Sequence, residues 1–291
     1  MPLEHLREIL QEMNIDPDHP DASRLDEFPA QLQEAIKGLP ELVRKVTALP
    51  DHYGLRAHQA EWHVRGVAYH CRNVVEKYKL FVNETGKRAG IDGGPPVTII
   101  MYAPVAQVLM FEFYALVNLS RIALDNLRNL LAPTFKTPLN QLPKSISDYS
   151  SGTTDCPVYR SLANQPVLSY LSDLRNCVVH YRSFATSDNA VVATEGFEGA
   201  AQMYSDLPSL FKAEFRLTGR NAIAVNVFLP DTIFEWVGTT KKLATFTYNE
   251  RINLLSQSRE FLRLIAYSTK DALSLLLTTP EPKYTFKKPT K

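Results

Sequence analysis

The sequence has few cysteines and no surplus of charge of one sign. Cys71, Cys156 and Cys177 are an odd number without C-x-x-C spacing, which argues against a disulfide framework and against a zinc site. The formal net charge is +1, so no global basic field attracts nucleic acid. Any contact with RNA therefore has to depend on local arginines and lysines, and a broad, sequence-independent RNA binder is not expected.

The sequence also predicts no segment that would direct or anchor the protein. The first five residues lack the basic run and apolar core of a secretory signal. The apolar segment 97–119 contains Pro104 and Glu112, and we interpret it as a buried helix rather than a membrane span. No Gly-rich phosphate loop, G-x-S-x-G or kinase signature is present. We therefore expect a protein of the reducing cytoplasm, without membrane contact, metal or other cofactor.

The sequence does contain ample apolar material in helical patterns. Its hydrophobic content of 45% over 291 residues suffices for a sizeable core. Helical spacing and Pro/Gly boundaries predict four helices, at about 55–87, 104–131, 166–184 and 249–277. The predicted fold is thus mainly α, a four-helix bundle within residues 51–291. An N-terminal extension at 1–50 is predicted to hold two short helices, 3–13 and 29–49.

The connections between the predicted helices differ in character. A loop of about thirty residues, rich in Pro, Ser and Thr, precedes the third helix and is long enough to be functional. Between the third and fourth helices, 190–194 and 222–228 are β-branched and alternating, so they predict strands in a small β-containing insertion at about 186–240. The sequence assigns this insertion no task.

The predicted third helix carries the residues best suited to chemistry. Arg175 and Asn176 are followed by His180, the only histidine beyond position 70, within one and a half helical turns. The chain has Arg-Asn pairs at 72, 128, 175 and 220, and only the pair at 175 has its histidine at this spacing. An arginine is also followed by a histidine at a similar spacing from Arg65 to His70 and from Arg56 to His63. Neither arginine is followed directly by an asparagine, so both are weaker matches than the one at Arg175.

A helix through this stretch has one apolar and one polar face. Asn176 and His180 are four residues apart and so stack on the same face, while the long Arg175 side chain lies between the two faces. The apolar face is predicted to contain Leu171, Leu174, Cys177, Val178 and Tyr181, and the polar face Ser169, Asp173, Asn176 and His180. A solvated polar face with an ordinary surface histidine is the alternative interpretation.

These residue types suit metal-independent cleavage of RNA. The RNA supplies its own nucleophile, the 2′-hydroxyl, so His180 would transfer the proton and Arg175 would bind the phosphate oxygens. Asn176 would orient the histidine or bind ribose or phosphate, because an amide both donates and accepts. The expected product is a 2′,3′-cyclic phosphate with a 5′-hydroxyl.

The stretch resembles the R-N-x-x-x-H signature of the HEPN family. The resemblance to the HEPN family covers about residues 55–185 and 249–278. It implies a helical bundle, an RNase site shared between the two protomers of a homodimer, and a role as a toxin or phage-defence effector with an antitoxin or other defence partner. HEPN toxins that are silenced by nucleotidyltransferases carry a tyrosine two residues after the histidine. This chain has Arg182 at that position. Regulation by tyrosine modification is therefore not expected.

The predicted second helix extends the resemblance. The family commonly pairs an acidic position with an Arg…Leu-Asp run, here Glu112 followed by Arg121 to Asp125. Arg121 and Asp125 share a helix face and could support Arg175 or His180, or form only an ion pair within the helix. Glu112 lies on the opposite face from Arg121, so its role stays open.

Three hypotheses about the function of this chain remain after these observations. The first is a HEPN-type endoribonuclease, and the second is a non-catalytic HEPN-like module that binds RNA, a nucleotide or a protein. The third is an unrelated helical interaction protein in which the motif is coincidental. The remaining histidines, including His58, His63 and His70, are interpreted as surface or packing residues because no single ion can reach them without another segment.

Overall fold

The protein is mainly α-helical, as the sequence predicts. The computed structural model describes residues 28–49, 53–88, 104–132, 134, 156–178, 191–194, 212–219, 222–237, 241–247 and 252–279. Its helices are α2 (Ala30–Lys37), α3 (Leu39–Thr47), α4 (Gly54–Arg88), α5 (Pro104–Leu131), α6 (Pro157–Ala163), α7 (Pro166–Asn176) and α8 (Leu254–Thr278). The predicted helix at 3–13 lies outside the described residues.

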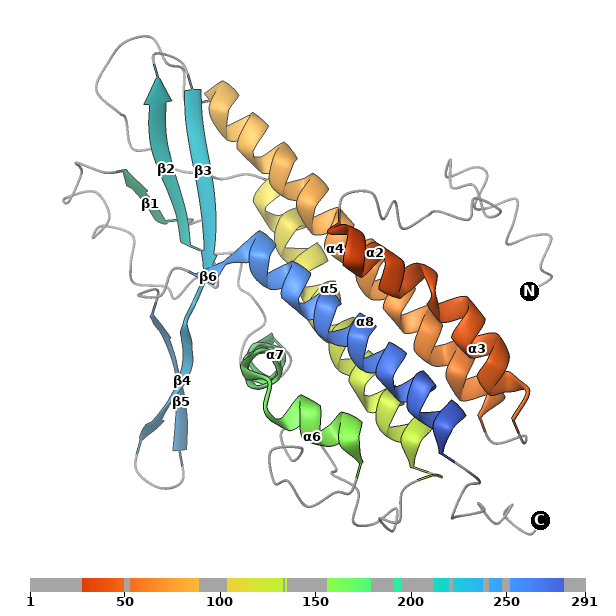
Figure 1. Cartoon of the computed structure of the whole chain (residues 1–291). Helices are drawn as coiled ribbons and strands as arrows, with labels where there is room; N and C mark the ends of the chain where they lie inside the picture. Colours follow the sequence, from red (N-terminus) through yellow and green to blue (C-terminus); the bar gives the residue numbers. More distant parts are fainter. Residues whose placement is uncertain are drawn as a thin grey trace, which may run out of the picture.

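The long helices α4, α5 and α8 lie side by side and enclose the core (Figure 1). Apolar residues recur three and four positions apart on each helix, so one face is buried continuously along its length. On α4 this buried face includes Ala57, Ala60, Val64, Val67, Cys71 and Val74. The predicted bounds of the first two long helices are close to those of α4 and α5. Within the part of the chain that the structure describes, no helix is both long and apolar enough to cross a membrane.

The predicted N-terminal helix at 29–49 is divided into α2 and α3 at Gly38. Pro40 stands at the start of α3, where its missing N–H costs little, but it prevents a continuous helix through this point. Both short helices pack on α8, and α3 also packs on α4. Their apolar residues belong to the same core as the long helices: Phe28, Leu32, Ile36, Leu39, Val43 and Val46.

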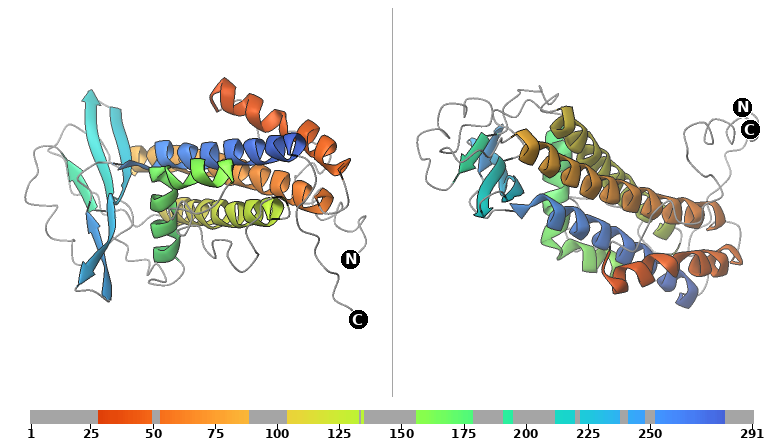
Figure 2. Two further views of the ribbon diagram at one scale, coloured as in Figure 1. Left: turned by 60° about the horizontal axis from the view of Figure 1, so that its bottom comes forward. Right: turned by 90° about the horizontal axis from the view of Figure 1, so that it is seen from above.

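The helices α6 and α7 cover another side of the bundle. The sequence predicted only a loop where α6 lies, yet this short helix buries Val158, Tyr159 and Leu162. The next helix, α7, begins at Pro166 as predicted, and its regular part ends at Asn176, followed by a wider π-type turn at Cys177 and Val178. The remainder of the helix predicted to 184 lies outside the described residues. In both views of Figure 2, α7 runs across the bundle from α6 toward α5.

The strands gather at one end of the bundle (Figure 1). They are β1 (Val191–Thr194), β2 (Lys212–Gly219), β3 (Ala222–Leu229), β4 (Thr232–Val237), β5 (Lys241–Thr247) and β6 (Ile252–Asn253). One sheet has the order β1-β2-β3-β6, with β1 parallel to β2 and the other pairs antiparallel; β4 and β5 form a separate antiparallel pair. The sequence predicted β1 and β3 but missed the other strands, and β structure extends past the predicted limit of 240.

The start of α8 shows how strand pairing changed a helix boundary. The sequence predicted a start at 249, whereas Ile252 and Asn253 pair with Leu229 and Phe228 of β3, and the helix begins at Leu254. Asn253 is also the N-cap, since its Oδ1 accepts hydrogen bonds from the backbone N–H groups of Leu255 (3.0 Å) and Ser256 (3.1 Å). One residue thus ends the sheet and starts the helix.

Replacing Asn253 with alanine is expected to lower the free energy of unfolding by about 1 kcal/mol, because the first turn of α8 loses its side-chain acceptor. Urea denaturation followed by circular dichroism measures this change. Asn253→Asp keeps the acceptor and serves as the matched control, with a midpoint close to that of the wild type. Equal losses in both variants would show that the cap bond contributes nothing.

Candidate functional site

The Arg175-Asn176 pair lies in the last turn of α7, where both side chains are half-buried. Their neighbours on the apolar face, Leu171, Leu174 and Cys177, are fully buried, so the predicted core face is confirmed for these residues. On the polar face, Ser169 is exposed and Asp173 is half-buried. The amphipathic pattern of α7 therefore leaves the pair at the surface while the backbone beneath it is packed.

The pair is connected internally and through its helix. Arg175 Nη1 donates to Asn176 Oδ1 over 3.4 Å, a long hydrogen bond that keeps the guanidinium beside the amide. One turn and a half earlier, the Tyr170 hydroxyl donates to the Pro230 carbonyl over 2.7 Å, which ties α7 to the segment between β3 and β4. The Tyr170 ring also stacks near Phe261 of α8, with centroids 6.4 Å apart. These contacts fix the position of α7 relative to the bundle.

His180 lies outside the described residues, so its assignment as the proton-transfer group stays a prediction. Chain connectivity places it four residues beyond Asn176, after the wider turn at Cys177 and Val178. Such turns alter the direction of the side chains that follow and are frequent at functional positions. The regular stacking of Asn176 and His180 that the sequence predicted therefore depends on how the chain continues after this turn.

Arg121 and Asp125 form an ion pair within α5, with 3.3 Å between Nε and Oδ2. This is the structural alternative that the sequence analysis left open for these residues. The Arg121 side chain is only 13% exposed, whereas that of Asp125 is 43% exposed, so the carboxylate has the freer access to solvent. A supporting role toward Arg175 or His180 stays a prediction.

Glu112 has a role that the sequence did not reveal. Its Oε2 lies 2.8 Å from His70 Nδ1 and accepts a hydrogen bond of 3.2 Å from Asn73 Nδ2. Both partners belong to α4, so the carboxylate connects the two antiparallel helices. Sequence patterns did not single out Asn73, and they placed His70 among surface or packing histidines. No local spacing could have found this cluster, because its members meet only through the packing of α4 on α5.

A second histidine occupies an equivalent position further along the same two helices. His63 lies within 3.2 Å of Asn126 of α5, measured from its Nδ1, and the same nitrogen contacts the Gln59 carbonyl. His63 and His70 therefore have polar partners of their own on the helices. Among the residues that the structure describes, no group of three or more His, Cys, Asp or Glu side chains is arranged to hold a metal ion.

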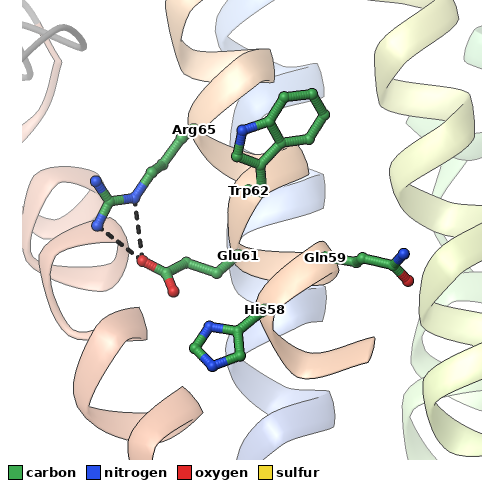
Figure 3. Close-up of a pocket in the computed structure, with 5 residues that line it drawn as sticks. All are labelled: His58, Gln59, Glu61, Trp62 and Arg65. Atoms are coloured by element: carbon green, nitrogen blue, oxygen red, sulfur yellow. Dashed lines mark hydrogen bonds and ion pairs between the residues drawn. The ribbon is translucent and has the colours of Figure 1, made fainter. Parts of the chain in front are cut away.

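Two surface hollows formed by residues that the structure describes lie away from the Arg175-Asn176 pair. One, of about 420 Å³, is formed by α4 alone and lined by His58, Gln59, Glu61, Trp62 and Arg65. Figure 3 shows Arg65 turned toward Glu61, to which its Nη2 bonds at 2.7 Å, while Gln59 points toward α5. Another, of about 380 Å³, lies between α2 and α8 and is lined in part by Arg259, Arg263 and Tyr267. Neither is lined by a residue that the sequence selected as catalytic or supporting.

The cysteines are unsuited to nucleophilic chemistry in the folded protein. Cys71, Cys156 and Cys177 are all free and all buried, in agreement with the expectation that they form no disulfide framework. Burial raises the pKa of the Cys156 thiol to about 11, so this group is neutral at physiological pH. The groups with the right chemistry for RNA cleavage are therefore arginine, amide and histidine rather than thiolate.

Comparison with models of protein families, with curated proteins and with solved structures gives no match to this chain. The site is accordingly interpreted from its own residues. The structure brings Arg175 and Asn176 together on α7 and joins Arg121 to Asp125 on α5, and it places Glu112 apart from them, between α4 and α5.

Proposed function

We propose that this chain is a metal-independent endoribonuclease of the HEPN type. The observation that carries the proposal is the environment of the Arg175-Asn176 pair, which is half-exposed on a helix whose opposite face is anchored in the core. A phosphate-binding guanidinium has to be accessible to RNA yet held in place, because reorganising it during the reaction would cost part of its stabilising effect. The half-exposed position of Arg175 meets the first condition, and the packing of α7 through Tyr170 meets the second.

The arrangement of helices supports the same proposal. The long helices α4, α5 and α8 pack against one another, and α7 packs against α5 and α8. In the proposed HEPN-like bundle, α7 would be the helix that carries the motif. The N-terminal helices and the strands are additions to that bundle. This order of helices along the chain is the second observation that supports the proposal.

The reaction follows from the chemistry of the named groups. His180 removes the proton of the ribose 2′-hydroxyl, whose oxygen attacks the adjacent phosphorus while the bond to the 5′-oxygen breaks. Arg175 neutralises the charge that gathers on the non-bridging phosphate oxygens, and Asn176 orients the histidine or the ribose. The departing 5′-oxygen needs a proton, which the histidine of a second protomer supplies if the cleft is shared. The products are a 2′,3′-cyclic phosphate and a 5′-hydroxyl.

The decisive experiment is to incubate the purified chain with total RNA and with tRNA in an excess of EDTA. We expect cleavage to persist, and we expect the new ends to resist 3′-end ligation until the cyclic phosphate is opened and the resulting phosphate is removed. Cleavage that EDTA abolishes, or that leaves 3′-hydroxyl ends, would contradict the mechanism. Binding of RNA without any cleavage would instead favour a non-catalytic binding module.

A further inference from the structure

The hollow between α2 and α8 combines cationic, hydroxyl and amide side chains. Its volume is about 380 Å³, which falls in the size range of sites for small molecules. The two helices that form its walls pack on each other, and both views of Figure 2 show them side by side. The polar residues that line this α2–α8 hollow are Gln31, Ser256, Arg259, Glu260, Arg263 and Tyr267.

The lining is rich in hydrogen-bond donors. Ser256, Arg259, Arg263 and Tyr267 follow one another three or four residues apart, so they lie along one line of α8. Among the described residues that line the hollow, Glu260 is the only carboxylate. Two arginines and one glutamate give the lining a net charge of +1. It therefore matches a ligand that is negatively charged and accepts hydrogen bonds.

The two arginines lie close together with little to neutralise them. Arg259 and Arg263 are four residues apart, a spacing at which like charges destabilise a helix. Glu260 Oε1 lies 3.4 Å from Arg263 Nη1, and both of these side chains are exposed to solvent. Among the residues that the structure describes, none forms a hydrogen bond or ion pair with the Arg259 side chain. An anion between the two guanidinium groups would turn this repulsion into two attractions.

Both walls of the hollow are anchored in the core. Gln33 Nε2 donates to the Phe28 carbonyl over 2.7 Å, which holds the start of α2, and Leu32 beside it is buried. On α8, Phe261 and Leu262 are fully buried beneath the row of arginines. The hollow is thus formed before a ligand arrives, so binding does not have to order its walls.

We propose that the α2–α8 hollow binds a small phosphate monoester. The guanidinium groups of Arg259 and Arg263 hold the phosphate by paired N–H···O bonds, for which their planar forks are suited. Their backbones are about 6 Å apart along the helix axis, a distance that two long side chains can span to reach one group. A monoester carries a charge of about −1.5 to −2 at neutral pH, so a single phosphate serves both arginines.

The rest of the ligand lies against the remaining lining. Ser256 and Tyr267 are about 16 Å apart along α8, so they contact the ligand on opposite sides of the phosphate. Gln31 offers an amide from α2, and Leu32 offers an apolar contact. These groups suit the body of an ester that carries hydroxyl or ring nitrogen atoms, and they would contribute nothing to the binding of free phosphate.

The hollow is less suited to an RNA strand. A strand binds through a succession of phosphates and so needs a longer row of cations than two arginines. The hollow also lies away from the motif: Phe261, which contacts Tyr170 of α7, is two residues from each arginine and so on roughly the opposite side of α8. The site is therefore separate from the Arg175-Asn176 pair, and its proposal does not depend on RNA cleavage.

Isothermal titration calorimetry with glucose 6-phosphate, adenosine 5′-monophosphate and inorganic phosphate tests the site. At least one monoester is expected to bind with a dissociation constant below about 1 mM, more tightly than inorganic phosphate, whereas glucose and adenosine should not bind. Arg259→Ala and Arg263→Ala should each raise that constant at least about 10-fold, as loss of a charged hydrogen-bond donor does. Lys270→Ala, exposed on the same helix outside the hollow, is the matched control and should bind normally.

A variant with the opposite expected effect separates binding from damage to the fold. Glu260→Gln removes the carboxylate that competes for Arg263, so it should tighten binding of the monoester by up to about fivefold. Failure of both monoesters to bind at about 10 mM, or binding that persists unchanged in the Arg259→Ala, Arg263→Ala double variant, would overturn the proposal. So would a 2′-O-methyl RNA, which cannot be cleaved, that binds through these arginines while neither monoester does.

Discussion

Replacing Arg175 with alanine should reduce RNA cleavage by about 1,000-fold or more with little change in stability. The guanidinium is the permanently charged group available to the phosphate at the motif, and loss of a preorganised donor at developing negative charge has effects of about 100- to 1,000-fold, or more for an arginine. The side chain is half-exposed, so its truncation leaves the core residues of α7 in place. Single-turnover cleavage of a labelled RNA in EDTA measures the effect.

Three further variants test whether the loss of cleavage in Arg175→Ala is due to the motif itself. Arg175→Lys keeps the charge but loses the planar fork, so it should recover only part of the activity. His180→Ala removes the proton-transfer group and should lower the rate by about 100- to 10,000-fold. Arg128→Ala, in an Arg-Asn pair on α5 that has no histidine following it, is the matched control and should cleave as the wild type does. Equal activity in all variants would locate the chemistry elsewhere or in a contaminant.

Replacing Phe261 with alanine is expected to lower the free energy of unfolding by about 3 to 5 kcal/mol, the range for deleting a buried aromatic ring. Phe261 is fully buried on α8, and its ring lies 6.4 Å, centroid to centroid, from both Phe113 of α5 and Tyr170 of α7. The cavity would thus open at the point where these three helices meet. Urea denaturation measures the loss, and Lys270→Ala, exposed on the same helix, should change stability by no more than about 0.5 kcal/mol.

The same variant tests whether the packing of α7 matters for cleavage. Tyr170 would lose its ring partner on α8 while keeping its hydrogen bond to the Pro230 carbonyl. We expect the folded fraction of Phe261→Ala, assayed at low temperature, to cleave RNA more slowly than the wild type, because Arg175 lies on the same helix. Cleavage at the wild-type rate, or a stability loss below about 1.5 kcal/mol, would show that α7 is not anchored through this contact.

The sequence was most informative about the long helices. Their apolar residues repeat at the helical period over many turns, and Pro104 and Pro166 stand at the starts of α5 and α7 as predicted. The sequence also identified which face of α7 is buried, at Leu171, Leu174 and Cys177. In each case the signal lies within a single element, so no knowledge of its neighbours was needed.

The strands show where local pattern was insufficient. The strand β2 alternates apolar residues with Lys212, Glu214 and Arg216, and such charged positions lower the local preference for β structure. What makes it a strand is its pairing with β3 and β1, contacts between segments distant in sequence. The same pairing moved the start of α8 from the predicted 249 to Leu254, because Ile252 and Asn253 were taken into the sheet.

By itself, then, the sequence determined the helical class, the positions of the long helices and the grouping of Arg175 with Asn176, because each depends on spacing along one chain segment. Only the tertiary structure decided that Glu112 bonds His70 and that the same carboxylate accepts a hydrogen bond from Asn73. Both depend on the register in which two antiparallel helices pack. That register is fixed by shape at contacts such as Gly66 against Leu119, which the periodicity of either helix does not encode.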